Sequence, residues 1–388
     1  GTERISPEML NGYPPEYAPM VRKLIYIALF CSCLLWAGCS SSSQTDSITV
    51  KVDLDVEGSD SVEHLLSVSC LVPLQADGMV SSVDKVCMMD SLIYVLDQKQ
   101  MALFIFNKEG YLRHTLKKLG RASGEYLSLD DFIVDEQGNI YLFDSSTQRI
   151  TCYDAEGHYH HKIEVCAGTG FIPCGADSLV VYNNILGECN LTIFNKAGNK
   201  LKEIPYPKEI PHMLISNGGG VFTSGDRLFF TNPFDYVLYA VDEDKTRPVY
   251  NFDFGSQNLT EDILKEKDRR QLVRKTIAFE GVRFLKNVAM YRNLLFFATD
   301  KDVQCVMDTN TLNVSVFNHM EMPYAVLLGK PVTVCPDGTF LTFVTAANME
   351  SLLSMPENYL EKYPFFQALG DVPHLDSEDY WIVVGQVQ

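Results

Sequence analysis

Oxygen-bearing side chains recur directly after short apolar runs of this sequence, and side chains of this kind can bind a cation. Carboxylate and amide oxygens are the ligands that Ca²⁺ takes in proteins. The carboxylates Asp97, Asp144 and Asp300 are therefore candidate metal ligands, with Asn183 and Asn232 at matching places. The same residue types accept hydrogen bonds from free backbone N–H groups in turns. Because they recur from run to run, we interpret them as turn residues and expect no cofactor, with Ca²⁺ as the alternative.

Three histidines, His158, His160 and His161, follow a predicted turn at Gly157. In a regular strand His158 and His160 would lie on one face, as two ligands of a metal site would. The nearby sequence suggests no third ligand at a suitable spacing. We therefore expect these histidines to lie on the exposed edge of an outer strand.

The sequence contains no recognisable catalytic set. Residues 120–124 are glycine-rich, but they lack the Gly-Lys-Ser/Thr of a phosphate loop, and a strand pattern follows where that loop needs a helix. We find no Gly-x-Ser-x-Gly elbow and no Ser/His/Asp grouping. We assign no catalytic residue, and the sequence leaves enzymatic activity open while leaning against it.

The apolar runs repeat a pattern that predicts the fold. The template is residues 140–144, a strand-like run after a Gly-Asn turn. Similar runs recur mostly about 40 to 50 residues apart, which is the spacing of four-stranded propeller blades, and a second strand pattern follows five of them. We predict an all-β fold, a six-bladed β-propeller of four-stranded antiparallel blades with short helical insertions. The six runs are residues 93–97, 140–144, 179–183, 228–232, 295–299 and 340–343.

Two insertions and a last strand complete the predicted ring. Residues 258–280 predict one helix with Thr260 as its N-cap, and residues 348–369 predict short helices. A ring of blades has to pair its first and last strands, because open edges promote aggregation. We expect the strand at residues 380–384 to pair with an N-terminal one, either at 47–54 or at 65–74.

The N-terminal region predicts export. Basic residues at 22–23 precede an apolar run at 24–36, which is short for a membrane span. The Ala-Gly pair before Cys39 and the serines after it resemble the acylation site of bacterial lipoproteins, so we expect a lipid anchor at Cys39. The expected parts are a non-native or over-long extension (1–19), a lipoprotein signal peptide (20–38), a Ser-rich tether (39–50) and the propeller (51–388).

The formal charge of −18 opposes nucleic-acid binding, because phosphate contacts need stripes of Lys and Arg. An acidic surface also keeps copies of a protein apart in solution. We therefore expect a monomer that has no nucleic-acid partner and contacts a membrane only through its anchor.

Several short segments together resemble a known family, the six-bladed β-propeller lipoproteins of Bacteroidetes, which are related to NHL-repeat propellers. The resemblance covers residues 65–388 and implies an exported propeller, anchored by lipid in the cell envelope at the outer membrane. It implies no particular activity. The segments that carry it are residues 120–126 (GRASGEY), 131–135 (DFIVD), 138–141 (GNIY), 144 and 149–150.

Three functions remain open. We expect first a binding or interaction module that takes a glycan, peptide or protein ligand at one face of the ring. The alternative is a metal-dependent hydrolase or lyase of the Ca²⁺ type that uses the central channel. A third is a scaffold subunit of an envelope complex, with contacts through residues 258–280 or 348–369.

Overall fold

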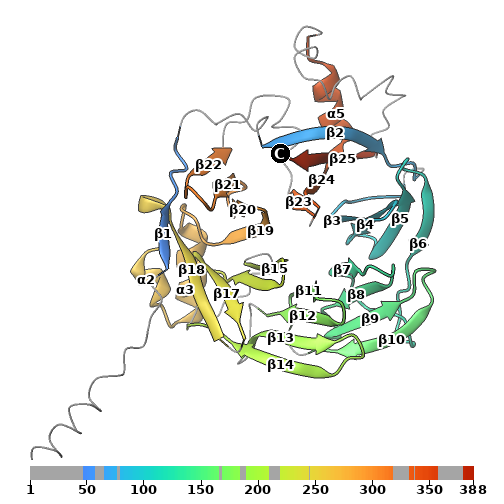
Figure 1. Ribbon diagram of the computed structural model, residues 1–388, viewed down its shortest axis with the longest axis horizontal. Coiled ribbons are helices and arrows are strands. Elements are labelled where there is room, and N and C mark those ends of the chain that lie inside the picture. Colours follow the sequence, from blue (N-terminus) through green and yellow to red (C-terminus); the bar gives the residue numbers. More distant parts are fainter. Residues whose placement is uncertain are drawn as a thin grey trace, which may run out of the picture. The chain divides into compact units, whose positions relative to one another are not determined.

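The computed structural model describes residues 47–56, 65–76, 79–165, 168–183, 189–208, 219–243, 245–317, 332–335, 337–356 and 379–388. These residues belong to one compact unit, Ser47–Gln388. Their strands form six sheets that lie around a ring as the blades of a β-propeller (Figure 1). The predicted fold class is confirmed.

The first three blades follow one another along the chain, and each runs from the axis outward. Blade 1 is β3 (Lys85–Met89), β4 (Leu92–Asp97), β5 (Ala102–Asn107) and β6 (Leu112–Leu116); blade 2 is β7 (Asp131–Val134), β8 (Ile140–Asp144), β9 (Arg149–Tyr153) and β10 (Tyr159–Glu164); blade 3 is β11 (Gly170–Cys174), β12 (Ser178–Tyr182), β13 (Cys189–Asn195) and β14 (Lys200–Pro205).

The other three blades include the first two strands of the chain, β1 and β2, and its last strand, β25. Blade 4 is β15 (Gly220–Ser224), β16 (Arg227–Thr231), β17 (Val237–Asp242) and β18 (Lys245–Asp253), with β1 (Ile48–Lys51) outside it; blade 5 is β19 (Leu285–Tyr291), β20 (Leu294–Thr299), β21 (Gln304–Asp308) and β22 (Val314–Phe317); blade 6 is β23 (Thr333–Val334), β24 (Thr339–Thr345), β25 (Tyr380–Val387) and β2 (Leu66–Pro73).

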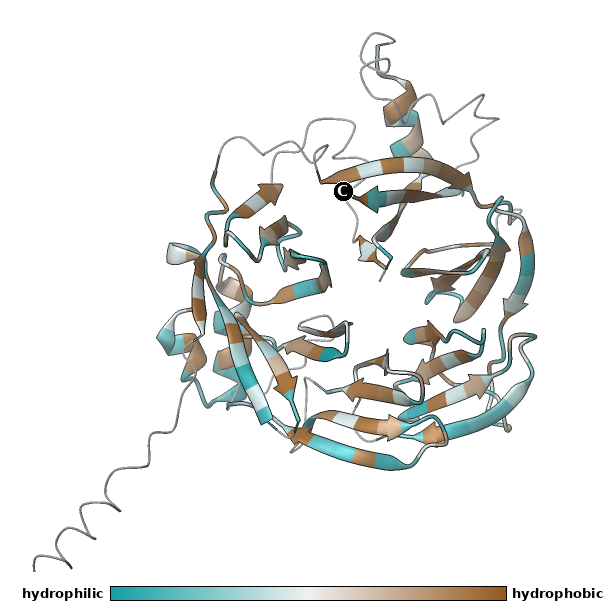
Figure 2. Cartoon of the chain, in the orientation of Figure 1, coloured by the Kyte–Doolittle hydropathy of each residue, from teal (hydrophilic) through white to brown (hydrophobic). Residues whose placement is uncertain are grey.

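The six template runs lie in the second strands of the six blades, and they are mostly apolar because both of their faces are covered. Every residue of β8 and β20 is buried. Phe132 and Ile140 of blade 2 pack with Leu103 of blade 1, while Phe143 packs with Phe171 of blade 3. The core is therefore a series of apolar layers between neighbouring blades. Polar residues gather on outer strands such as β10 and β14 (Figure 2).

The ring closes through the second of the two predicted N-terminal strands. β2 pairs antiparallel with β25, from Leu66 opposite Val387 to Pro73 opposite Trp381. The other candidate segment has a different place, since β1 pairs parallel with β18 at the edge of blade 4. It covers the outer edge of that blade. Its first residue is Ile48, so a strand of blade 4 already begins before residue 51, where the sequence predicted the propeller to start.

The single helix predicted at residues 258–280 is wrong. The chain forms η3 (Gly255–Gln257), α2 (Glu261–Leu264) and α3 (Arg269–Ala278). The break has a local cause, because the Asp268 side chain accepts a hydrogen bond from the backbone N–H of Gln271 and so begins a new helix. The short helices pack onto the end of blade 4 through Ile263 and Leu272, which contact Phe234.

The second predicted helical insertion is present in part. α5 (Ala346–Leu353) begins with a capping box between Thr345 and Asn348, and it buries Met349 and Leu352 against blade 6. Residues 357–369 of this insertion lie outside the described residues, as do Cys39 and the signal segment before it. Within the described ranges, no helix combines the length and the apolar character needed to cross a membrane.

Candidate functional site

The acidic residues that end the second strands accept hydrogen bonds from the loops between blades. The buried Asp97 accepts from the backbone N–H groups of Ser81 at 2.7 Å and Ser82 at 3.1 Å. Asp144 accepts from the Ser128 hydroxyl at 2.9 Å. Burial raises the pKa of each carboxyl, but the hydrogen bonds outweigh it and lower both pKa values below the ordinary aspartate value. Each carboxylate fastens its blade to the loop that enters it.

Asp300 and the two asparagines have other partners. The Asp300 carboxylate accepts from the Arg283 backbone N–H at 2.9 Å and from its guanidinium at 2.5 Å. The buried amides of Asn232 and Asn190 exchange hydrogen bonds of 2.9 and 3.0 Å, and the Asn183 amide donates to a neighbouring carbonyl at 3.2 Å. A Ca²⁺ ion bound by Asp97, Asp144 or Asp300 would have to share the carboxylate with these donors or displace them.

One group of three potential metal ligands is found in the part of the chain that the structure describes. Asp154, Glu156 and His158 bring ligand atoms within 4.8 Å of one another on the turn between β9 and β10. The Asp154 carboxylate also accepts the backbone N–H groups of Glu156 at 3.1 Å and His158 at 2.7 Å, as in an Asx turn. The sequence prediction paired His158 with His160 and overlooked Asp154 and Glu156, because these two carboxylates lie in the turn before the strand.

A β-bulge changes the expected arrangement of the histidines. The β9 partners of Tyr159 and His161 are consecutive residues, so His160 is an extra residue in β10. His160 therefore contacts His161, with 2.9 Å between their Nδ1 atoms, while His158 contacts the turn. The prediction that His158 and His160 share one face of a strand is wrong, because β10 begins at Tyr159 and His160 is the bulge residue. The exposed edge is confirmed, since His158 and His160 are both exposed.

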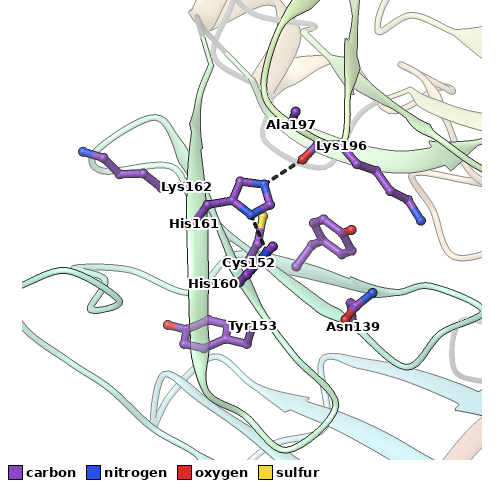
Figure 3. A pocket seen from close by; sticks show the side chains of 9 residues that line it. Asn139, Cys152, Tyr153, His160, His161, Lys162, Lys196 and Ala197 are labelled. Atoms are coloured by element: carbon purple, nitrogen blue, oxygen red, sulfur yellow. Dashed lines mark hydrogen bonds between the residues drawn. The ribbon is translucent and has the colours of Figure 1, made fainter.

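A pocket of about 530 Å³ lies between blades 2 and 3 beside the bulge (Figure 3). Its floor includes the buried Cys152, and burial raises the pKa of this thiol to about 12, so the thiol is protonated at neutral pH. The ring of His161 stands between the side chain of His160 and the backbone of Lys196. The lining residues are Asn139, Tyr141, Cys152, Tyr153, His160, His161, Lys162, Lys196 and Ala197.

An ion pair joins the two blades under this pocket. The Lys196 ammonium lies 2.7 Å from the buried Asp135 carboxylate, which also accepts from the Asn139 backbone at 2.9 Å and the Tyr141 hydroxyl at 3.2 Å. Burial raises the pKa of Asp135, but the hydrogen bonds from Lys196 and Asn139 outweigh it, and the pKa is lower than that of an ordinary aspartate. The pocket therefore has a fixed, ionised support.

The pocket presents hydrogen-bond donors. Its lining residues include no carboxylate and offer amide, imidazole and ammonium groups around buried aromatic rings. Such groups suit ligands rich in oxygen acceptors, such as sugars or peptide carbonyls. The sequence pointed to Asn139 only as a turn residue and did not single out Lys162 or Lys196. Lys196 lies in an Asn-Lys-x-Gly turn that also occurs at residues 107–110.

Comparison with known proteins gives a family and a fold. A family described as "Domain of unknown function (DUF4934)" matches residues 48–379. No curated protein matches the sequence. A crystal structure of a candidate exported protein from Bacteroides fragilis is similar with a TM-score of 0.66 at 16% identity, over 88% of this chain and 100% of that one. A member of the duf4221 family from Bacteroides vulgatus has a TM-score of 0.54 at 11% identity, over 84% and 99%. At these identities the similarity shows the propeller fold.

Proposed function

The chain belongs to the DUF4934 family, and from this premise we propose that it is an exported binding module of the cell envelope, monomeric and held by a lipid at Cys39. The observation that carries the binding role is the donor-lined pocket between blades 2 and 3. The ligand is a glycan, a peptide or a segment of a protein that presents oxygen acceptors to this pocket.

The uses of the other polar groups support this choice of site. The carboxylates at the strand ends already accept several hydrogen bonds from the scaffold. In the pocket Asn139 and Lys196 likewise donate to Asp135, and Lys162 pairs with Glu164. The Lys162 side chain is nevertheless 47% exposed and His160 is exposed, so a ligand can reach both. The buried rings behind them give the pocket a firm wall.

Filling the pocket tests the binding role. Ala197 is exposed on the turn at its edge, and Ala197→Trp places an indole there. We expect the full chain to retain members of a glycan array or a peptide library, and the variant to bind them at least about 10-fold more weakly, a loss of about 1.4 kcal/mol. Glu109→Trp, at the matching position of the blade 1 turn, is the control and should bind like the wild type. Equal retention by the Ala197→Trp variant would contradict the proposal.

The anchor has a separate test. Cys39→Ser removes the thiol that would carry the lipid, so the protein should move from the membrane fraction to the soluble fraction after cell lysis. Cys70→Ser, at an exposed cysteine of β2, is the control that should stay with the membranes. Membrane retention of the Cys39→Ser variant would refute the lipid anchor and leave the binding proposal standing.

A further inference from the structure

Two imidazoles of blade 2 face each other across a short distance. The Nδ1 atoms of His160 and His161 are 2.9 Å apart, and the rings are tilted by 78° with their centroids 4.9 Å apart. Consecutive residues of a regular strand point to opposite faces. The bulge at His160 removes this alternation and brings the two side chains together.

The far side of the His161 ring fixes which of its nitrogens can bind a metal. Its Nε2 lies 2.6 Å from the carbonyl oxygen of Lys196, and a carbonyl oxygen can only accept, so Nε2 carries the hydrogen. In the neutral ring Nδ1 is then the acceptor of a hydrogen bond from the Nδ1–H of His160. A metal ion would take the place of this proton once His160 carries its hydrogen on Nε2. Metal-binding histidines are commonly oriented in this way, by donating the other ring N–H to a backbone carbonyl.

The separation of the two nitrogens selects a coordination geometry. With metal–nitrogen bonds of about 2.0–2.1 Å, two ligand atoms 2.9 Å apart subtend about 90° at the metal. Tetrahedral coordination would need a separation of about 3.3 Å at the same bond length. An angle near 90° belongs to square-planar and octahedral ions, which include Cu²⁺ and Ni²⁺.

We propose that His160 and His161 form a two-histidine site for a divalent transition-metal ion of square-planar or octahedral preference, Ni²⁺ or Cu²⁺. The remaining positions of the ion face solvent and the pocket, because His160 is exposed and both histidines line the pocket. They are filled by water or by oxygen and nitrogen groups of a bound molecule. The site rests on the geometry of the imidazoles and does not depend on the proposed binding function.

Titration of the full chain with NiCl₂, followed by calorimetry at pH 7.5, tests the site. We expect His160→Ala and His161→Gln each to lower the Ni²⁺ affinity at least about 10-fold, because removing only an outer-shell partner of a metal ligand already costs that much. Glutamine keeps an N–H that can donate to the Lys196 carbonyl but has no counterpart of Nδ1. An unchanged midpoint of thermal unfolding in His161→Gln therefore assigns its loss of affinity to ligation.

Two control variants separate this site from its neighbours. His158→Ala removes a ligand of the turn cluster, and His114→Ala removes a histidine of the outer strand of blade 1; both should bind Ni²⁺ like the wild type. A loss confined to His158→Ala would place the metal on Asp154 and Glu156 and overturn the proposal. So would identical isotherms for the wild type and a His160→Ala/His161→Gln double variant.

Discussion

The outer strands β6 and β10 occupy the same place in blades 1 and 2, but only β10 carries a histidine pair. Each follows a turn that ends in glycine, and each has a bulge one residue before a histidine, at His114 in β6 and at His161 in β10. The bulge residue is Arg113 in one strand and His160 in the other. The bulge is thus part of the blade architecture, whereas the second imidazole is particular to blade 2.

The turns before the outer strands of blades 1 and 3 give a second comparison. Residues 107–110 and 195–198 share the pattern Asn-Lys-x-Gly. Lys196 reaches the buried Asp135 of the preceding blade, while Lys108 is 69% exposed beside Glu109. At the place of Asp135, blade 6 has Cys335, with the same turn hydrogen bonds around it. The same turn pattern therefore joins two blades through Lys196 in blade 3, whereas in blade 1 its lysine is exposed to solvent.

The largest expected effect comes from the glycines of these two turns. Gly110 has φ +86°, and a Cβ added there would lie 1.8 Å from the carbonyl oxygen of Pro73 in the closing strand β2. Gly198 has φ +90°, but its Cβ would lie 3.4 Å from Ile163, which is ordinary contact. We expect Gly110→Ala to lower the free energy of unfolding by at least ~3 kcal/mol, and Gly198→Ala by the conformational cost alone, about 1 kcal/mol.

Urea unfolding of the two variants measures this difference. Because the backbone fixes the position of the added Cβ and the clashing atom is the backbone oxygen of Pro73, the Gly110 clash cannot be relieved by turning a side chain. Equal losses in the two variants would mean that β2 yields without cost, and would weaken its assignment as the strand that closes the ring.

The next effect concerns the lysines of the same turns. Asp135→Asn leaves the Lys196 ammonium, whose side chain is only 22% exposed, without its carboxylate, and we expect a loss of about 3 kcal/mol of unfolding free energy. Lys108→Ala removes an exposed lysine of the matching turn and should cost less than ~0.5 kcal/mol. Similar losses in both variants would contradict the difference between the two turns.

The pH dependence of the Asp135→Asn variant sharpens this prediction. The folded-state pKa of Asp135 is lowered, so its contribution to stability is fully present above the unfolded-state pKa of about 3.9. It is lost as the pH falls through the lower, folded-state pKa. The difference in unfolding free energy between wild type and variant should be constant above about pH 5 and shrink below about pH 4. A difference that stays constant into strong acid would show that Asp135 acts in another way.

The sequence predicted the parts of this fold that repeat. The second strands and their turns depend on local residue patterns, so Ile140 and its counterparts were found without the structure. The break before α3 depends on the N-cap at Asp268. The place of β1 depends on which blade has an unpaired outer strand, here β18 of blade 4. Neither feature follows from the pattern of apolar residues alone. Propensity identifies elements better than it identifies their partners.

The candidate site was harder to predict because it depends on register. His160 and His161 are adjacent in the sequence, and only the pairing of β10 with β9 places them together. Alignment of the glycines at residues 110, 157 and 198 supplies a signal, since it places Arg113 and His160 at the same position. Lys196 was missed for a different reason, because its partner Asp135 lies in another blade and no local pattern links the two.

The smallest expected effect is a gain of binding in blade 1. Arg113→His copies the histidine pair of blade 2 into β6, beside His114. The His114 ring lies against Gly157 and, within the described part of the chain, donates to no carbonyl, so its Nδ1 is not oriented as that of His161 is. In the His160→Ala background we therefore expect the added pair to bind Ni²⁺ at least about 10-fold more weakly than the original pair. Calorimetry that finds equal affinities would show that the bulge alone creates the site, and that the contact between His161 and the Lys196 carbonyl adds nothing to it.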